Sequence, residues 1–250
     1  MNNSEKISAV GYCNKCKKEH FLYEGNAKRF CDELIKNLDK YGRLDFEEPE
    51  EKADPRFSTD YVFGKARGQM FGILECIDKD GKQVILKAFS GQYNGVWEIK
   101  NWVPPLLNAE EFDELIIEDD KKIKAVGKKI LELPENSDQK KELVKERKKL
   151  SQNLLKQIYD LYELNNFSGE KKSLSEVFGS YAIPTGTGDC CAPKLLNFAA
   201  LNNLKPVSLA EFYYGKENLS GTKMYKEFYS SCKEKCYPIL GYFLCGTDNE

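Results

Sequence analysis

The sequence predicts an α+β fold, because strong signals for strands and for helices occur in different segments. Apolar runs on either side of Asp80-Gly81 are typical of a β-hairpin over 68–91. Two stripes of apolar residues at helical spacing, separated by Pro134, predict an antiparallel helical hairpin inserted at about 119–165. A helix from Cys190 onward, a strand over 207–214 and a helix near Pro238 predict a helix-strand-helix unit in the last quarter.

Composition places the chain among globular proteins without a strong charge bias. Of its 250 residues, 41% are apolar and 31% charged, and the net charge is -2. The overall basic excess of a dedicated nucleic-acid binder is therefore lacking. No apolar run approaches the roughly 20 residues that span a bilayer, and the polar segment 1–6 does not begin a signal peptide. We expect a cytoplasmic protein with no membrane partner, whose nine cysteines are mostly reduced.

Cysteines near the N-terminus indicate a first metal site. Cys13 and Cys16 form a C-x-x-C pair, His20 follows, and Cys31 lies just inside an expected helix. Thiolates on a turn, with an imidazole and a further thiolate, would give zinc four tetrahedral ligands. Surface thiols on a disordered tail and a redox pair are the alternatives, although no βαβ pattern surrounds the pair. His20 is the single histidine, so any histidine-dependent catalytic scheme would have to use it.

These features predict three parts of the chain. A zinc-knuckle-like module with a helix over 27–41 is expected at 1–46, and an acidic stretch with two prolines predicts a linker at 47–66. A mixed α/β domain with the inserted helical hairpin is expected at 67–250. In this domain 97–102 is a candidate third strand, stopped by Pro104. Its residues Trp97 and Trp102 would serve either as buried anchors or to stack bases.

The expected helical hairpin carries a basic cluster. Ser137 is a candidate N-cap of its second helix. The cations of the cluster are Lys140, Lys141, Lys145, Arg147, Lys148 and Lys149. They could contact RNA phosphates. Glu142 and Glu146 are interleaved with them, so the pattern also fits a solvated face with ion pairs one helical turn apart.

A glycine-rich loop in the last quarter leads into a helix that begins with two cysteines. Asp189 is a candidate N-cap of this helix, and Pro193 falls in its first turn, where a missing amide proton costs little. Cys190 and Cys191 then lie at the positive end of the helix dipole, which stabilises thiolates.

The same cysteines are candidates for a second metal site. Cys190 or Cys191, together with Cys232 and Cys236, would give zinc three thiolate ligands. Water, Glu211 or Asp189 would take the fourth position, and the two carboxylates are the tentative catalytic residues. Glu211 lies within the expected strand and faces either solvent or this site. Buried structural thiols and a redox or disulfide pair are the alternatives.

Several segments resemble the N-terminal extension of some RluA-type RNA pseudouridine synthases. They read Arg-Gly-Gln-Met-Phe-Gly-Ile-Leu at 67–74, Ala-Phe-Ser-Gly at 88–91, Trp-Val-Pro-Pro at 102–105, Gly-Thr-Gly-Asp-Cys-Cys-Ala-Pro-Lys-Leu-Leu at 186–196 and Ala-Glu-Phe-Tyr-Tyr-Gly at 210–215, with a further match at 232–240. The catalytic aspartate of that family lies in His-Arg-Leu-Asp, whereas 42–45 reads Gly-Arg-Leu-Asp. The resemblance implies a stand-alone accessory protein that does not isomerise uridine itself. Its implied partners are RNA (tRNA or rRNA) and RNA-modification proteins.

The order helix, hairpin, helix, strand, helix is also similar to the core of zinc-dependent nucleoside deaminases. That family begins one helix with His/Cys-Ala-Glu and the next with Pro-Cys-x-x-Cys. Cys191-Ala192-Pro193 and the Cys232–Cys236 pair occupy the corresponding points, but Pro193 replaces the glutamate and the pair has one extra residue between its cysteines. This resemblance implies a degenerate deaminase-like core. The leading hypothesis is a zinc-containing accessory protein acting with RNA; a deaminase-like zinc hydrolase and a protein-interaction scaffold are the alternatives.

Overall fold

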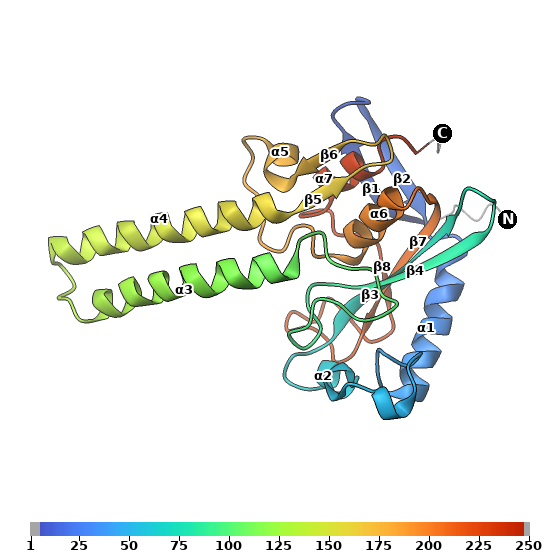
Figure 1. Cartoon of the computed structure of the whole chain (residues 1–250), viewed down its shortest axis with the longest axis horizontal. Coiled ribbons are helices and arrows are strands. Elements are labelled where there is room, and N and C mark those ends of the chain that lie inside the picture. Colours follow the sequence, from blue (N-terminus) through green and yellow to red (C-terminus); the bar gives the residue numbers. More distant parts are fainter. Residues whose placement is uncertain (1–5, 248–250) are drawn as a thin grey trace.

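The computed structural model describes residues 6–247 and confirms a mixed α+β fold. Figure 1 shows a body of strands and helices from which two long helices project side by side. In chain order the strands are β1 (Ile7–Cys13), β2 (Lys18–Tyr23), β3 (Gln69–Ile77), β4 (Gln83–Phe89), β5 (Glu163–Asn165), β6 (Lys171–Ser173), β7 (Lys205–Tyr214) and β8 (Phe228–Tyr229). The α-helices are α1 (Ala27–Tyr41), α2 (Asp60–Phe63), α3 (Ala109–Leu131), α4 (Asp138–Leu161), α5 (Leu174–Phe178), α6 (Cys191–Leu201) and α7 (Tyr237–Phe243).

A four-stranded antiparallel sheet in the order β4-β3-β7-β8 organises the body. Successive side chains of a strand point to opposite faces of its sheet. On β3, Phe71 and Ile73 accordingly pack into the same core as α1. Leu74 and Cys76 pack on the other face, into the core that contains α6. The sheet thus separates two hydrophobic cores, and α6 brings the cysteines at its start against one face.

The predicted β-hairpin is formed by β3 and β4, which pair from Phe71 with Phe89 to Ile77 with Gln83. Its turn uses Gly81 at a φ of 79°, a conformation that glycine adopts without steric cost. The candidate third strand at 97–102 is not a strand, since Asn101 has a φ of 66° and breaks the extended backbone. Both tryptophans of this segment are buried, and Trp102 Nε1 donates to the carbonyl of Leu44 at 3.1 Å. They therefore serve as core anchors and not as exposed stacking platforms.

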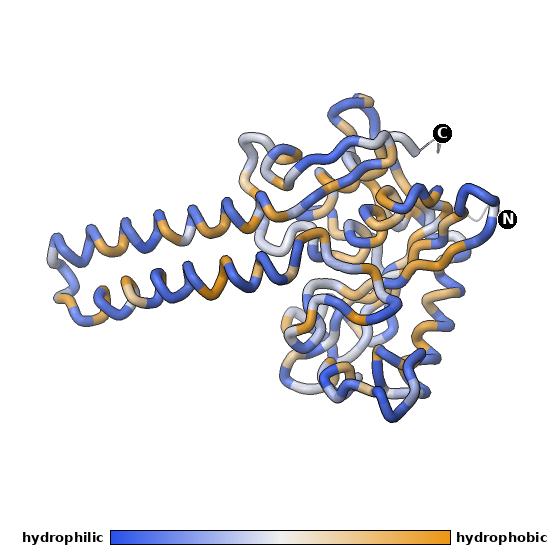
Figure 2. The backbone as a smooth tube through the Cα atoms, viewed as in Figure 1, coloured by the Kyte–Doolittle hydropathy of each residue, from blue (hydrophilic) through white to orange (hydrophobic). Residues whose placement is uncertain are grey.

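The projecting pair in Figure 1 is the predicted helical hairpin, α3 and α4. Its first helix begins at Ala109, about ten residues earlier than expected, because the Asn108 side chain caps the amides of Glu110 and Glu111. Ser137 caps α4 as predicted, accepting from the Lys140 amide at 3.2 Å. Figure 2 shows hydrophilic residues along much of both helices. No helix in the described residues is long and apolar enough to cross a membrane.

The N-terminal segments pack directly on the rest of the body. α1 lies against β7 and β3, and the β1–β2 hairpin, which the sequence did not predict, lies against α7. The expected linker at 47–66 contains two 3₁₀ turns, Glu50–Lys52 and Pro55–Phe57, as well as α2. Val62 of α2 is fully buried. Contacts therefore cross both of the expected domain boundaries.

Candidate metal centre

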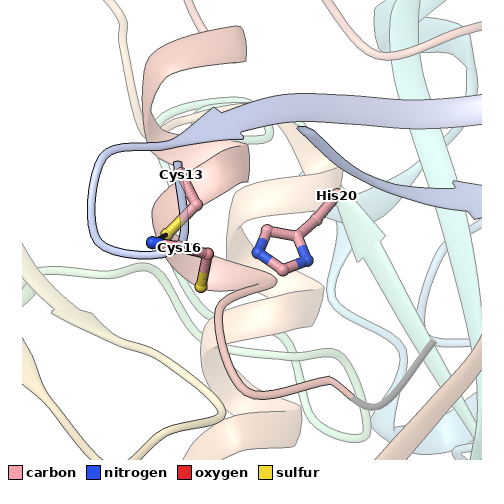
Figure 3. Close-up of side chains that lie close together, drawn as sticks. All are labelled: Cys13, Cys16 and His20. Carbon is pink, nitrogen blue, oxygen red and sulfur yellow. Dashed lines mark hydrogen bonds between the residues drawn. The ribbon is translucent and has the colours of Figure 1, made fainter. Parts of the chain in front are cut away.

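Cys13, Cys16 and His20 form a cluster that could hold a metal ion (Figure 3). Their ligand atoms all lie within 4.8 Å of one another. Cys13 ends β1, Cys16 lies in the turn, and His20 belongs to β2. In the hairpin register His20 pairs with Gly11, which is two residues before Cys13. Because residues two apart share a face of a strand, Cys13 and His20 project to the same side of the hairpin.

Hydrogen bonds in the turn between β1 and β2 favour the thiolate form of Cys13. The Cys16 amide donates to the Cys13 Sγ at 3.4 Å, and the Lys17 amide donates to the Cys13 carbonyl at 2.8 Å. Burial raises the pKa of Cys13, but hydrogen bonds from Cys16, Cys245 and Lys15 outweigh this effect, so the pKa lies below its usual value. Since the thiolate is the metal-binding form, the turn favours coordination.

His20 contributes an unsatisfied nitrogen to the cluster. The side chain is only 5% exposed, and within residues 6–247 its Nε2 has no hydrogen-bond partner. Leaving a buried polar atom unpaired costs about 1–3 kcal/mol. Burial, aided by the charge of Lys18, lowers the pKa of His20. The ring is thus neutral at neutral pH, as a metal ligand must be, and in Figure 3 one of its nitrogens faces the thiols.

Cys31 does not join this cluster, contrary to the sequence prediction. Its thiol donates to the Ala210 carbonyl on β7 at 3.4 Å. Helical spacing places Cys31 on the same face of α1 as Ala27, Leu34 and Leu38, and this face packs on the sheet. Complete burial raises the pKa of Cys31 well above the usual value of a thiol. Cys31 is therefore a core residue.

The C-terminal cysteines, Cys190, Cys191, Cys232 and Cys236, do not converge in the same way. Among residues 6–247, only Cys13, Cys16 and His20 form a group of three ligand atoms with metal-binding spacing. The Cys191 thiol donates to the Met70 carbonyl on β3 at 3.3 Å, which directs it into the sheet. Cys190, not Asp189, is the N-cap of α6. The thiols of Cys190 and Cys236 interact, and this contact, together with burial, raises the pKa of Cys236.

The two carboxylates predicted beside these cysteines are both buried. Glu211 is turned inward: its Oε1 accepts from the Ala192 amide at 3.1 Å and its Oε2 from the Ser231 hydroxyl at 2.8 Å. Burial raises the pKa of Glu211. Asp189 accepts from the Tyr162 hydroxyl at 2.6 Å, and burial raises its pKa as well. Glu211 therefore links the start of α6 to Ser231, and Asp189 links it to Tyr162. Of the two predicted orientations of Glu211, the one toward solvent is wrong.

Sequence reasoning missed two residues that the structure makes prominent. Lys194 is buried, and its ammonium donates to the carbonyls of Phe89 at 3.0 Å and Gly91 at 2.7 Å. Burial lowers the pKa of Lys194 to about 8. Cys245 lies just beyond α7, with its Sγ 3.4 Å from the Cys16 Sγ. The predicted sites left two cysteines unassigned, Cys76 and Cys245, and nothing in the sequence distinguished the second from the first.

The basic cluster on α4 divides into two groups. Lys140, Lys141 and Lys145 form ion pairs with nearby carboxylates at 2.8–3.1 Å. The other three, Arg147, Lys148 and Lys149, are exposed and form no ion pair within the described part of the chain. The structure is therefore compatible with both predicted roles of the cluster.

Comparisons of the chain with protein-family models, with curated proteins and with solved structures found no match. The resemblance to pseudouridine synthase extensions therefore depends on the motif segments alone. Three of these segments are neighbours in the structure: 67–74 contributes most of β3, 210–215 the end of β7, and 186–196 the start of α6. The strands β3 and β7 pair with each other, and α6 packs on both.

Proposed function

We propose that the protein is an accessory RNA-binding protein of RNA modification, and that its projecting helical hairpin contacts the phosphate backbone. The proposal depends mainly on one observation, the separation of charge along this hairpin. Its supports are the exposed cations of α4 and the resemblance of β3, β7 and the start of α6 to extensions of RNA-modifying enzymes. In this role the body would position the hairpin and perform no chemistry.

Charge along α3 and α4 changes sign between the body and the tip. Residues 109–120, next to the body, include seven acidic and no basic residues. Residues 121–149, which form the distal part and the turn, include eleven basic and five acidic residues, for a net charge of +6. A polyanion is therefore attracted to the tip and repelled from the base of the hairpin. The net charge of the whole chain is slightly negative and does not by itself favour RNA binding, but the positive charge is concentrated at the tip, where a phosphate backbone can bind.

The ion pairs of α4 do not prevent phosphate binding. The pairs of Lys141 with Asp138 and of Lys145 with Glu142 are solvent-exposed. Exposed pairs contribute only about 0–1 kcal/mol, so a phosphate can replace the carboxylate at little cost. Arg147, Lys148 and Lys149 are exposed and need no such exchange.

Binding of tRNA and rRNA fragments over a range of salt concentrations tests the proposal. The triple variant Arg147→Gln, Lys148→Gln and Lys149→Gln should bind more weakly, and its plot of log affinity against log salt should be shallower by about 2–3, one contact per removed cation. The matched control, Lys65→Gln, Lys79→Gln and Lys82→Gln, removes three exposed cations elsewhere on the body and should bind like the wild type. No measurable affinity of the wild type at low salt, or equal weakening by both variants, would contradict the proposal.

A deaminase-like hydrolase is the second candidate, and the placement of Glu211 favours it. Glu211 is a buried carboxyl that accepts from the Ala192 amide at the start of α6, and burial raises its pKa, as a general acid requires. The elements α1, β3, β4, α6 and β7 occur in the chain order of that core, with α2 between α1 and β3 and with α3 to α5 between β4 and α6. Zinc-activated water would still require a metal next to Glu211, and the described residues offer no such group there. Ammonia release from nucleosides or RNA that is abolished in Glu211→Gln would favour this candidate over the first.

A further inference from the structure

The end of the chain returns to the N-terminal hairpin through a contact between two glycines. A Cβ on Gly11 would lie 2.1 Å from the Gly241 nitrogen, and a Cβ on Gly241 would lie 2.1 Å from the Tyr12 carbonyl oxygen. Only glycine at both positions allows β1 and α7 to approach this closely. Cys13 lies two residues after Gly11, and Cys245 lies four residues after Gly241. The contact therefore brings Cys245 to the N-terminal cluster across 229 residues of sequence.

Cys245 lies next to the cluster, although its sulfur is not within 4.8 Å of every one of the Cys13, Cys16 and His20 ligand atoms. The Cys245 Sγ lies 3.4 Å from the Cys16 Sγ, and the Cys245 thiol also interacts with the Cys13 thiol. In a tetrahedral zinc site with bonds of about 2.3 Å, neighbouring sulfurs are about 3.8 Å apart. Cys13 and Cys245 are each only 2% exposed, whereas Cys16 is exposed and leaves a route by which an ion can enter.

We infer that Cys13, Cys16, His20 and Cys245 form a Cys₃His zinc site that joins the N-terminal hairpin to the C-terminal helix. Four protein ligands leave no open position, which is characteristic of a structural site and not of a catalytic one. The ion would occupy the space beside the unpaired Nε2 of His20 and would satisfy that atom. The site is independent of the proposed RNA function, because none of its ligands belongs to α3 or α4.

Hydrogen-bond donors surround the sulfurs of the proposed zinc site, which would carry a negative charge. Three thiolates, a neutral imidazole and Zn²⁺ together carry one negative charge. Lys15 lies in the same turn, where its ammonium forms an ion pair with Glu170 at 3.0 Å and lies near the Cys245 and Cys16 thiols. The Ser168 hydroxyl donates to the Cys245 Sγ at 3.8 Å, and Lys15 donates to Ser168 at 3.4 Å. Donors around ligating sulfurs orient them and offset their charge.

A disulfide explains the cluster less well than a metal does. Joining Cys16 to Cys245 would use two of the three sulfurs and leave the buried His20 nitrogen unsatisfied. A zinc ion would instead use all three sulfurs as thiolates, together with the His20 nitrogen.

Cobalt substitution of the full-length protein tests the inference. Thiolate-to-cobalt charge-transfer absorption grows with the number of sulfur ligands, so Cys245→Ser should lose about one third of it per bound cobalt. The matched control is Cys31→Ser, which removes another fully buried thiol, and it should keep the wild-type spectrum. An unchanged spectrum in Cys245→Ser, or a loss in Cys31→Ser, would overturn the inference.

X-ray absorption of the zinc-loaded wild type decides the question even if Cys245→Ser does not fold. The expected first shell contains three sulfurs at about 2.3 Å and one nitrogen at about 2.0–2.1 Å. A shell with two sulfurs would overturn the inference. So would protein that, purified from zinc-supplied cells under reducing conditions, lacks metal and contains a Cys16–Cys245 disulfide.

Discussion

The N-terminal cluster and the C-terminal cysteines differ in where their sulfurs point, because the first is built on a β-hairpin and the second around the start of a helix. At the N-terminus a strand pair aims Cys13 and His20 to one side, and the turn adds Cys16. Around α6 the helix separates its two cysteines: Cys191 points to the sheet, while Cys190 meets Cys236. The β-hairpin aligns residues of matched register on one face, whereas consecutive residues at a helix start diverge by about 100°.

The surroundings of the two regions differ as well. The N-terminal cluster leaves a buried nitrogen unpaired, which a metal would satisfy. The C-terminal region satisfies its buried carboxylates internally, since Glu211 and Asp189 both accept hydrogen bonds. We therefore expect the N-terminal region to respond to metal and the C-terminal region to respond to pH.

Metal removal should produce the largest effect. Zinc bound about 1,000-fold above its Kd stabilises the folded state by about 4 kcal/mol, so a chelator should lower the free energy of unfolding by a similar amount. Urea unfolding followed by circular dichroism, with zinc and with chelator, measures this change. In Cys13→Ser the chelator should have almost no further effect, whereas Cys190→Ser should respond like the wild type. If the chelator lowered the free energy of unfolding equally in both variants, the N-terminal region would not be the one that responds to metal.

The glycine contact should produce the next largest effect. Gly241 is helical, so alanine there is intrinsically favoured, but its Cβ would meet the Tyr12 carbonyl at 2.1 Å. We expect Gly241→Ala to cost about 3 kcal/mol or more in thermal or urea unfolding, and to weaken zinc binding because Cys245 is displaced.

Gly127→Ala is the matched control for that substitution. Gly127 is also helical, and a Cβ there would have its nearest neighbour at 3.8 Å, an ordinary contact. Helix propensity then predicts a gain of about 0.5–1 kcal/mol. If the two alanine variants lose stability equally, the glycine contact does not hold the chain ends together.

Local signals explain which parts of the fold could be predicted from the sequence. The Asp80-Gly81 turn and the apolar stripes of α3 and α4 act over a few residues, and these elements formed as predicted. The strand expected at 97–102 failed because the left-handed backbone of Asn101 overrides the β propensity of its neighbours.

In the candidate metal centre, too, only the residues that lie close together in sequence could be predicted. Cys13, Cys16 and His20 are close in sequence, so their spacing was sufficient to group them. Cys31 was assigned to them by proximity in sequence, but the face of α1 that packs on the sheet determined its position. Cys245 could not be found from spacing, because it arrives through the contact of Gly11 with Gly241.

The smallest expected effect is a pH dependence in the C-terminal region. Burial raises the pKa of Glu211 in the folded state, so its neutral form is favoured by folding. Its contribution is fully present below the pKa of the unfolded chain and is lost as the pH rises through the folded pKa. In Glu211→Gln this loss should disappear, and the difference between variant and wild type should grow with pH by about 1.4 kcal/mol per unit of pKa shift. We would measure urea unfolding at pH 4 and pH 8, on either side of the unfolded pKa, with any bound metal removed beforehand so that the contribution of Glu211 is separated from that of the metal. A constant difference between the two proteins at both pH values would show that Glu211 is ionised when folded, and the contrast between a metal-responsive and a proton-responsive region would then fail.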